Sequence, residues 1–533
     1  MMLRKIQTLL CLSTEILFTE REKMAGANKV AKNSFLYTVA NMVTKASTFL
    51  LLFIYTNPAF LSTEDYGRVN LLTSFTNIAV LLVNLSLPYA LIRFYAEYKL
   101  DKEKCRKFFG TIMTFMAVFG TAVVAVMLLL REPVGNLLFK GIAVYPAVIF
   151  TLLTLVFNAM YQMYQSILQA QQQGGKFAKN SLLFFFFHVS LNIILLIFGR
   201  GVYIFGFELG GVNGMMLSLF LSNFVFTIYG IIDMLRHGLM SFVIDKEMLK
   251  ISLKYSIPLL PHNIANNMAS YISKHFLNAA GKAFENGIYS VSMQFSSIIE
   301  IVQSSIHLAF RPWFNDKMKL GDEGKKEIVD LASVAFRISA IVCLGVALFS
   351  QEVVMLLNKN YYDAWKYVPI IAVAHAIKFV YFTHTFGIMY DVKQSKKMFF
   401  CSGSAIVVNF TASYILTHFG LYNMLAAALC FVVSRATAAI VSVVICRKHD
   451  IIKYNIGEMG FIILLVTVFS AVGIIPVNML YVGWHNEIAL FSGTFFINVI
   501  FKLVVFAFGA ICIVGKKKKD ILSLVKGIIK KKL

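Results

Sequence analysis

Residues 256–311 read SIPLLPHNIANNMASYISKHFLNAAGKAFENGIYSVSMQFSSIIEIVQSSIHLAFR. The stretch is apolar enough for two membrane-spanning helices joined by a short turn, yet it carries polar side chains that lipid would exclude. At about 100° per residue, the first half places several of them on one helical stripe. These are Asn263, Asn267, Ser270 and Lys274, flanked by His262, Asn266 and Ser273. The second half repeats the spacing with Glu300, Ser304, His307 and Arg311. Two such helices facing each other predict a hydrated cavity inside a membrane.

The composition of the whole chain indicates an all-α polytopic membrane protein. Of the 533 residues, 58% are hydrophobic and 14% are charged, and the mean hydropathy is +0.72. Each apolar run is close to the roughly 20 residues that cross a bilayer core. We expect about 14 spans, at 33–57, 69–92, 108–130, 142–165, 181–199, 209–235, 253–278, 287–311, 329–350, 367–390, 398–417, 420–446, 458–480 and 489–514.

The distribution of Lys and Arg predicts the orientation of these spans. With the N-terminus in the cytoplasm, the inner segments hold 37 of these residues and the outer segments hold 7. Positive charge favours the cytoplasmic side, so we expect both termini to be cytoplasmic. No connection between spans exceeds about 20 residues, so the function is expected within the membrane or at its faces.

A weak internal repeat suggests two halves. Gly67, Phe75 and Ile78 match Gly287, Phe295 and Ile298 at an offset of about 220 residues. Six spans per half give parallel repeats, as in many transporters. The expected organisation is an N-terminal cytoplasmic segment (1–32), a six-helix N-lobe (33–235), a six-helix C-lobe (253–446), two further spans (458–514) and a basic tail (515–533) that forms an amphipathic helix on the inner leaflet or is disordered.

Several function classes find no support in the sequence. The net charge of +23 is concentrated in short loops, a pattern that sets membrane orientation and does not require nucleic acid. The seven cysteines show no metal-ligand spacing. No hydrolase, metalloprotease or nucleotide-binding motif is present, so we expect no enzyme activity, metal or cofactor. We expect residues 1–24 to form an interfacial helix or to lie upstream of a start at Met24.

Charged residues near the middle of predicted spans are candidates for the cavity. Lys45, Glu300 and Lys378 would each cost about 2.5–3.5 kcal/mol if they faced lipid. They are therefore expected to face a cationic cavity or to form ion pairs with one another. Glu300 is the candidate for coupling to a proton or a sodium ion.

Other polar residues have two interpretations each. Lys274 assists release of a substrate or extends to the outer surface, and Arg311 binds phosphate or anchors the inner end of its helix. His307 titrates near neutral pH or serves in packing. Two further polar stripes occur, Asn158, Tyr161, Gln162, Gln165 and Gln169 in the fourth span and Asn70, Ser74, Asn77 and Asn84 in the second. They suit sugar hydroxyls, or they join helices by hydrogen bonds.

The start of the chain resembles the Wzx-type flippases of polysaccharide repeat units. The similarity covers about residues 30–450 and includes KNSFLYTVANMVTKASTFLLLFIYTNPAFLSTEDYG at 32–67, LSLPYALIRFYAEY at 85–98, SIPLLPHNIANNMASYIS at 256–273, ENGIYSVSMQFSSII at 285–299 and YYDAWKYVPIIA at 361–372. The family's superfamily also holds lipid II flippases and MATE multidrug exporters. One departure is Ser273-Lys274-His275, where many relatives carry an acidic residue.

The resemblance implies two six-helix lobes, alternating access and a substrate of undecaprenyl-pyrophosphate-linked oligosaccharide in a bacterial cytoplasmic membrane. Membrane lipids, a polysaccharide polymerase and glycosyltransferases are the expected partners. A MATE-like exporter of cations is the alternative transporter, although a basic cavity disfavours cationic substrates. A membrane polymerase or ligase is the alternative from another class, and the short outer loops argue against it.

Overall fold

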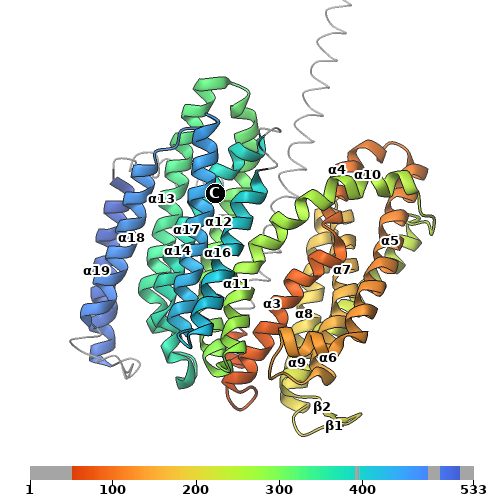
Figure 1. Cartoon of the computed structure of the whole chain (residues 1–533), viewed down its shortest axis with the longest axis horizontal. Coiled ribbons are helices and arrows are strands. Elements are labelled where there is room, and N and C mark those ends of the chain that lie inside the picture. The colour runs from red at the N-terminus through yellow and green to blue at the C-terminus, as the bar shows by residue number, and fades with distance from the viewer. Residues whose placement is uncertain (1–50, 391–393, 395–396, 478–491, 516–533) are drawn as a thin grey trace, which may run out of the picture.

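The computed structural model describes residues 51–390, 394, 397–477 and 492–515, which form a bundle of long helices (Figure 1). Lys45, the segment 1–32 and the tail 516–533 lie outside the described residues. The predictions made for these three parts of the chain therefore stay predictions.

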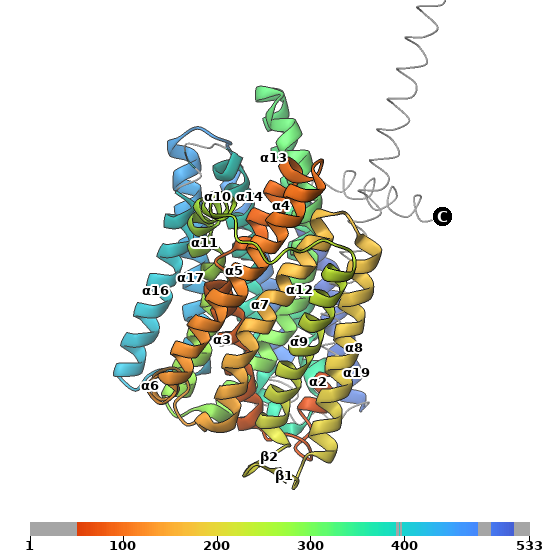
Figure 2. The same ribbon diagram turned by 90° about the vertical axis from the view of Figure 1, so that its right-hand side faces the viewer.

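A first group of helices occupies one side of the bundle (Figure 1). Its elements are α2 (Leu52–Tyr55), α3 (Thr63–Asn84), α4 (Leu87–Tyr98), α5 (Lys102–Leu129), α6 (Arg131–Leu138), the short helical turn η1 (Val144–Val148), α7 (Ile149–Ala170), α8 (Gly174–Phe198) and α9 (Gly211–Arg236). A short hairpin, β1 (Tyr203–Ile204) and β2 (Phe207–Glu208), joins α8 to α9. Figure 2 places it at the opposite end of the bundle from α4.

A second group follows after the connecting helix α10 (Lys246–Ser256) and the turn η2 (Ile257–Leu259). It contains α11 (Leu260–Ala279), α12 (Ala283–Met318), α13 (Gly321–Val354), η3 (Lys359–Lys366), α14 (Val368–Tyr390), α16 (Met398–His418) and α17 (Met424–Lys448). The last helices, α18 (Ile456–Val477) and α19 (Gly493–Val514), pack against α13 at the far edge of this group (Figure 1).

Short polar side chains begin several of these helices. Ser62 accepts a hydrogen bond from the backbone N–H of Asp65 and caps α3. Asp101 accepts from the N–H groups of Glu103 and Lys104 and caps α5. The backbone N–H of Lys104 holds the pKa of Asp101 below its ordinary value. These capping residues set the positions at which α3 and α5 begin.

Among the described residues, ten helices are long and apolar enough to cross a membrane, or eleven when α3 and α4 are counted as one bent span. The chain is therefore a multi-pass membrane protein, while the count of 14 stays a prediction. Neither α11 nor α12 belongs to the ten. Both carry the polar stripes that residues 256–311 predict, which lowers their hydropathy.

Two spans and one loop differ from the sequence prediction, and one hairpin was not predicted. The expected span 69–92 is broken, because α3 and α4 meet at 51°. The expected span 253–278 is also broken, by the turn η2 that contains Pro258. The expected loop 311–328 is largely helical, since α12 continues to Met318 and α13 begins at Gly321. The all-α prediction also missed the hairpin, whose two-residue turn uses positive φ angles at Phe205 and Gly206.

The two groups touch directly where α3 crosses α12. A methyl group at Gly67 would overlap the carbonyl oxygen of Ala283, and one at Gly287 would overlap the carbonyl oxygen of Thr63. The Asn286 side chain donates a hydrogen bond of 3.2 Å to the Gly67 carbonyl. The two glycines that the sequence repeat pairs are thus neighbours, and their lack of a side chain permits the close approach.

Candidate functional site

A polar cavity of about 290 Å³ lies between α3 of the first group and three helices of the second. We call it the charged cavity. Its lining includes Asn70 and Asn77 from α3, Lys274 from α11, Glu300 from α12 and Arg435 from α17. The sequence prediction that the stripes of α11 and α12 border a shared cavity agrees with this arrangement for Asn267, Ser270, Lys274 and Glu300.

Lys274 connects the two helix groups across this cavity. Its Nζ donates a hydrogen bond of 2.9 Å to Ser74 Oγ on α3, and its side chain is buried. The lysine therefore does not extend to the outer surface, which was one of its two predicted interpretations. Ser74 is a neutral partner, so no carboxylate balances the Lys274 ammonium in this hydrogen bond, and an anionic ligand in the cavity would supply that balance.

Glu300 and Lys378 form an ion pair of 2.8 Å between α12 and α14. The Lys378 side chain is 11% exposed and the Glu300 side chain 40%. Lys378 Nζ also lies 5.1 Å from the centre of the Phe382 ring. Glu300 therefore shows both predicted arrangements, because it lines the charged cavity and also forms an ion pair. Lys378 forms the ion pair but is not among the residues that line the cavity.

Arg435 is the cavity residue to which the sequence analysis gave no role. Its guanidinium carbon lies 4.8 Å from the centre of the Phe431 ring, and both residues line the charged cavity. Its buried Nε has no hydrogen-bond partner in the described part of the chain. The available signal was a charge inside an apolar span, which by itself marks a candidate functional residue. The three basic residues Arg435, Lys274 and Lys378 outnumber the one acid, Glu300. The lining of the charged cavity together with the partner of Glu300 therefore has a formal net charge of +2.

Asn263 and His307 are not among the described residues that line this cavity. Asn263 donates a hydrogen bond of 3.0 Å to Ser86 Oγ, between α3 and α4. His307 packs between Phe382 and Phe386, with ring centres 5.1 and 4.5 Å away. Arg311 belongs to α12, well before the end of that helix at Met318.

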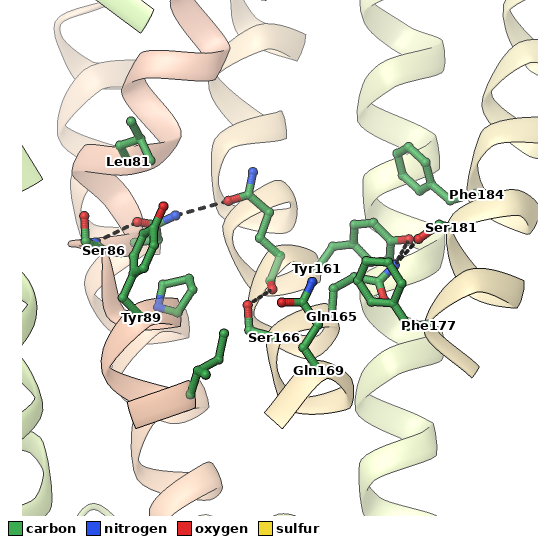
Figure 3. Close-up of a pocket in the computed structure, with 14 residues that line it drawn as sticks. Leu81, Ser86, Tyr89, Tyr161, Gln165, Ser166, Gln169, Phe177, Ser181 and Phe184 are labelled. Atoms are coloured by element: carbon green, nitrogen blue, oxygen red, sulfur yellow. Dashed lines mark hydrogen bonds between the residues drawn. The ribbon is translucent and has the colours of Figure 1, made fainter. Parts of the chain in front are cut away.

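A second and larger cavity, of about 440 Å³, lies within the first group (Figure 3). We call it the amide cavity. It is bordered by α3, α4, α7 and α8, and its polar lining includes Asn84, Tyr161, Gln162, Gln165, Gln169 and Ser181. The stripe on α7 and the last asparagine of the α3 stripe thus meet here. None of the 14 lining residues carries a charge.

Hydrogen bonds join the helices around the amide cavity. Asn84 Nδ2 donates to Gln162 Oε1 over 3.2 Å, which connects α3 to α7. Gln165 Nε2 donates to the Tyr161 hydroxyl over 2.6 Å and to Ser181 Oγ over 3.1 Å. The predicted role of these residues in joining helices is therefore present for Asn84, Gln162 and Gln165. Among the described residues, no group of acidic, histidine and cysteine side chains could hold a metal ion.

Comparison with known proteins gives a family match over more than half of the chain. A profile of the family described as "Polysaccharide biosynthesis protein" matches residues 30–318. No curated protein matches the sequence.

Three solved structures with the same fold are distant from this chain in sequence. A structure described as "Lipid II flippase MurJ, inward closed conformation" is 13% identical, with 90% of this chain and 99% of that chain covered and a TM-score of 0.66. An inward-facing multidrug resistance MATE family transporter of the MOP superfamily is 16% identical, with 75% and 94% covered and a TM-score of 0.59. A MOP superfamily transporter from Pyrococcus furiosus is 14% identical, with 79% and 95% covered and a TM-score of 0.56. At these identities the likeness shows the fold.

Proposed function

Because this chain belongs to the polysaccharide biosynthesis protein family, we propose that it is a flippase that moves lipid-linked oligosaccharide repeat units across a bacterial cytoplasmic membrane. The proposed substrate is an undecaprenyl-pyrophosphate-linked oligosaccharide, made for an O-antigen, a capsule or an exopolysaccharide. The observation that carries the proposal is the charged cavity, which is polar, has a net positive charge and lies between the two helix groups.

The physical task of such a protein is to give a polar headgroup a route through hydrocarbon. An unpaired charge or an unbonded hydroxyl in lipid costs several kcal/mol, and a pyrophosphate with several sugars carries many such groups. Lys274 and Arg435 would offset the charge of the pyrophosphate, Arg435 by a two-pronged hydrogen bond. The prenyl chain would stay in lipid throughout. No covalent bond changes, so no catalytic residue is needed.

Alternating access would carry the headgroup from one face to the other. In our proposal, 14 spans form two six-helix lobes and an added pair, with both termini in the cytoplasm. The cavity accepts the headgroup from the inner leaflet, and rocking of the lobes about the α3–α12 contact exposes it to the outer face. The polymerase and the glycosyltransferases of the same pathway are the proposed partners.

Glu300 is the proposed coupling residue. It faces the charged cavity and touches Lys378, so a proton or a sodium ion entering the cavity would compete with the lysine for the carboxylate. Binding of the cation would weaken the ion pair between α12 and α14 and so bias one arrangement of the second group.

Deletion of the gene tests the proposed function directly. We expect lipid-linked repeats to accumulate on the inner leaflet of the deletion strain, and the intact gene to restore their export. Efflux of a cationic dye measured in the same cells tests the MATE-like alternative. Unchanged export of repeats together with lost dye efflux would replace our proposal by that alternative.

Glu300→Gln tests the coupling role in the same strain. We expect export about tenfold or more below the wild type and a loss of its dependence on external pH, because glutamine neither binds a cation nor titrates. Glu285→Gln, at the start of α12 and outside the lining of the charged cavity, is the matched control. Unchanged export and unchanged pH dependence in Glu300→Gln would remove Glu300 from the mechanism.

A further inference from the structure

The amide cavity has the size of a ligand site. Its volume of about 440 Å³ falls within the roughly 300–1,000 Å³ typical of small-molecule sites. A water molecule needs about 30 Å³, so the space far exceeds what side chains that only join helices would leave between them. Its chemistry is also distinct, because amides, hydroxyls and aromatic rings line it without a single charge (Figure 3).

Two glutamines in this cavity have hydrogen-bonding capacity to spare. Gln165 is only 8% exposed, and its Oε1 has no partner. Its amide nitrogen already bonds Tyr161 and Ser181, and turning the amide over would only leave the nitrogen without a partner instead. Gln169, one helical turn further along α7, lines the same cavity, and Figure 3 marks no hydrogen bond between its side chain and the other lining residues. A buried amide atom left unpaired costs about 1–3 kcal/mol, and a ligand removes that cost only when the Gln165 amide rotates toward the cavity, because its Oε1 is closed to solvent in this arrangement.

Aromatic rings stand beside these amides. Tyr161 stacks on Phe184 with ring centres 4.8 Å apart and planes at 14°, and Phe177 lines the same space. The face of an aromatic ring is negative and attracts the slightly positive C–H groups of a flat ligand face. A sugar ring presents such C–H faces together with hydroxyls that both donate and accept. Amides beside aromatic faces therefore match an uncharged sugar in both respects.

The α3 stripe joins this cavity to the charged one. Asn70, Asn77 and Asn84 are spaced by seven residues, so they lie on nearly the same face of α3. Asn70 and Asn77 line the charged cavity, and Asn84 lines the amide cavity. Seven helical residues span roughly 10 Å, so one extended headgroup could reach both.

We propose that the amide cavity is a binding subsite for uncharged sugar rings of the oligosaccharide, separate from the charged cavity that takes the anionic group. This inference rests on the proposed function. It assigns the two parts of one headgroup to two cavities, so that variants of one cavity should leave binding at the other unchanged.

Binding to the full-length protein in nanodiscs tests the subsite. Three probes are used: the lipid-linked repeats extracted from the deletion strain, the free oligosaccharide that mild acid releases from them, and inorganic pyrophosphate. We expect Gln169→Leu and Gln165→Leu each to weaken binding of the free oligosaccharide by about two- to tenfold, the effect of one neutral hydrogen bond, and to leave pyrophosphate binding unchanged. Arg435→Gln should weaken binding of pyrophosphate and leave binding of the free oligosaccharide unchanged.

Gln171→Leu is the matched control, because Gln171 lies two residues beyond Gln169 and outside the lining. Gln169→Leu breaks no hydrogen bond to the other lining residues that Figure 3 marks, so it keeps the test valid if Gln165→Leu fails to fold. The proposed subsite is wrong if the wild type binds the lipid-linked repeat but not the free oligosaccharide. It is also wrong if neither glutamine variant weakens binding of the free oligosaccharide. In both cases the proposed flippase function is unaffected. Equal competition by glycerophosphoethanolamine would also overturn it, in favour of a lipid headgroup. If the wild type binds no lipid-linked repeat, the proposed function itself fails.

Discussion

Lys378 is much less exposed than its partner Glu300, at 11% against 40% of the side chain. Removing Glu300 would leave an ammonium in a nearly dry position, whereas removing Lys378 would leave a carboxylate that cavity water can solvate. A fully buried pair loses about 3–5 kcal/mol when one partner is removed. We expect about 1–2 kcal/mol for Lys378→Met after allowance for the solvation of Glu300.

The double variant Lys378→Met with Glu300→Gln should recover most of this loss, because no charge is then left unpaired. Thermal unfolding in detergent measures both variants. Lys366→Met is the control, since Lys366 pairs with Asp363 at 2.7 Å on the more exposed η3 and should lose less than about 1 kcal/mol. Equal losses in the single and the double variant would show that the ion pair contributes nothing.

The sequence singles out Glu300 and Lys378 as candidates, because each is a charge in the middle of an apolar run. It could not show that the two are partners, since that depends on the rotation of α12 against α14. Arg435 carried the same signal as Lys378 but had no polar stripe around it to suggest a cavity. His307 has the correct helical spacing from Glu300, yet it packs between the apolar rings of Phe382 and Phe386 and is not among the residues that line the charged cavity.

Helix α3 can approach α12 closely only because glycine stands on both sides of their crossing. We expect Gly67→Ala and Gly287→Ala each to force these helices apart, since each methyl group would overlap a backbone carbonyl that cannot move independently. Export should fall sharply in both, and disulfide cross-linking of cysteines placed at Thr63 and Asn286 should slow.

Gly460→Ala in α18 is the matched control, since a methyl group there meets nothing within 4 Å. It should export and fold as the wild type does. If Gly67→Ala and Gly287→Ala keep full export and fast cross-linking, the α3–α12 crossing is not a contact that transport requires.

The break between α3 and α4 marks the limit of prediction for an element. Leu85 and Ser86 both adopt left-handed backbone conformations, with φ angles of 49° and 56°, at a cost of about 1–2 kcal/mol each. The surrounding run is apolar, so its composition predicts one continuous span. Pro88 was the local signal for a new helix start. The Asn84 side chain that accepts from the Ser86 N–H belongs to tertiary structure that periodicity does not contain.

At the scale of the molecule, hydropathy predicted the membrane bundle and placed most of its helices within a few residues. It also predicted residues 256–311 as two helices beside a cavity, although both are too polar to pass as spans by composition. The sequence could not predict the amide cavity, because the polar stripes of α3 and α7 are equally consistent with side chains that only join helices. Only the distance between those helices, which depends on the bend at Leu85, separates the two interpretations.

The attachment of α19 to α13 depends on a buried polar cluster. Lys502 is fully buried, and its Nζ donates to Glu352 Oε1 and Gln351 Oε1 at 2.7 Å each. Asn498 donates to the same Glu352 oxygen over 2.7 Å. We expect Glu352→Leu to destabilise the protein by about 3–5 kcal/mol, because it leaves the ammonium of Lys502 unpaired in a dry interface. Thermal unfolding of the protein in nanodiscs measures the loss.

Glu352→Leu combined with Lys502→Met should be close to the wild type in stability, since two apolar side chains replace the pair. Glu327→Leu is the control, because its partner Lys317 lies at 2.6 Å in a more exposed position. Neither cavity takes a lining residue from α19, so the double variant should also export repeats normally. A double variant that is stable but inactive would mean that the charge of this cluster, and not only its packing, takes part in transport.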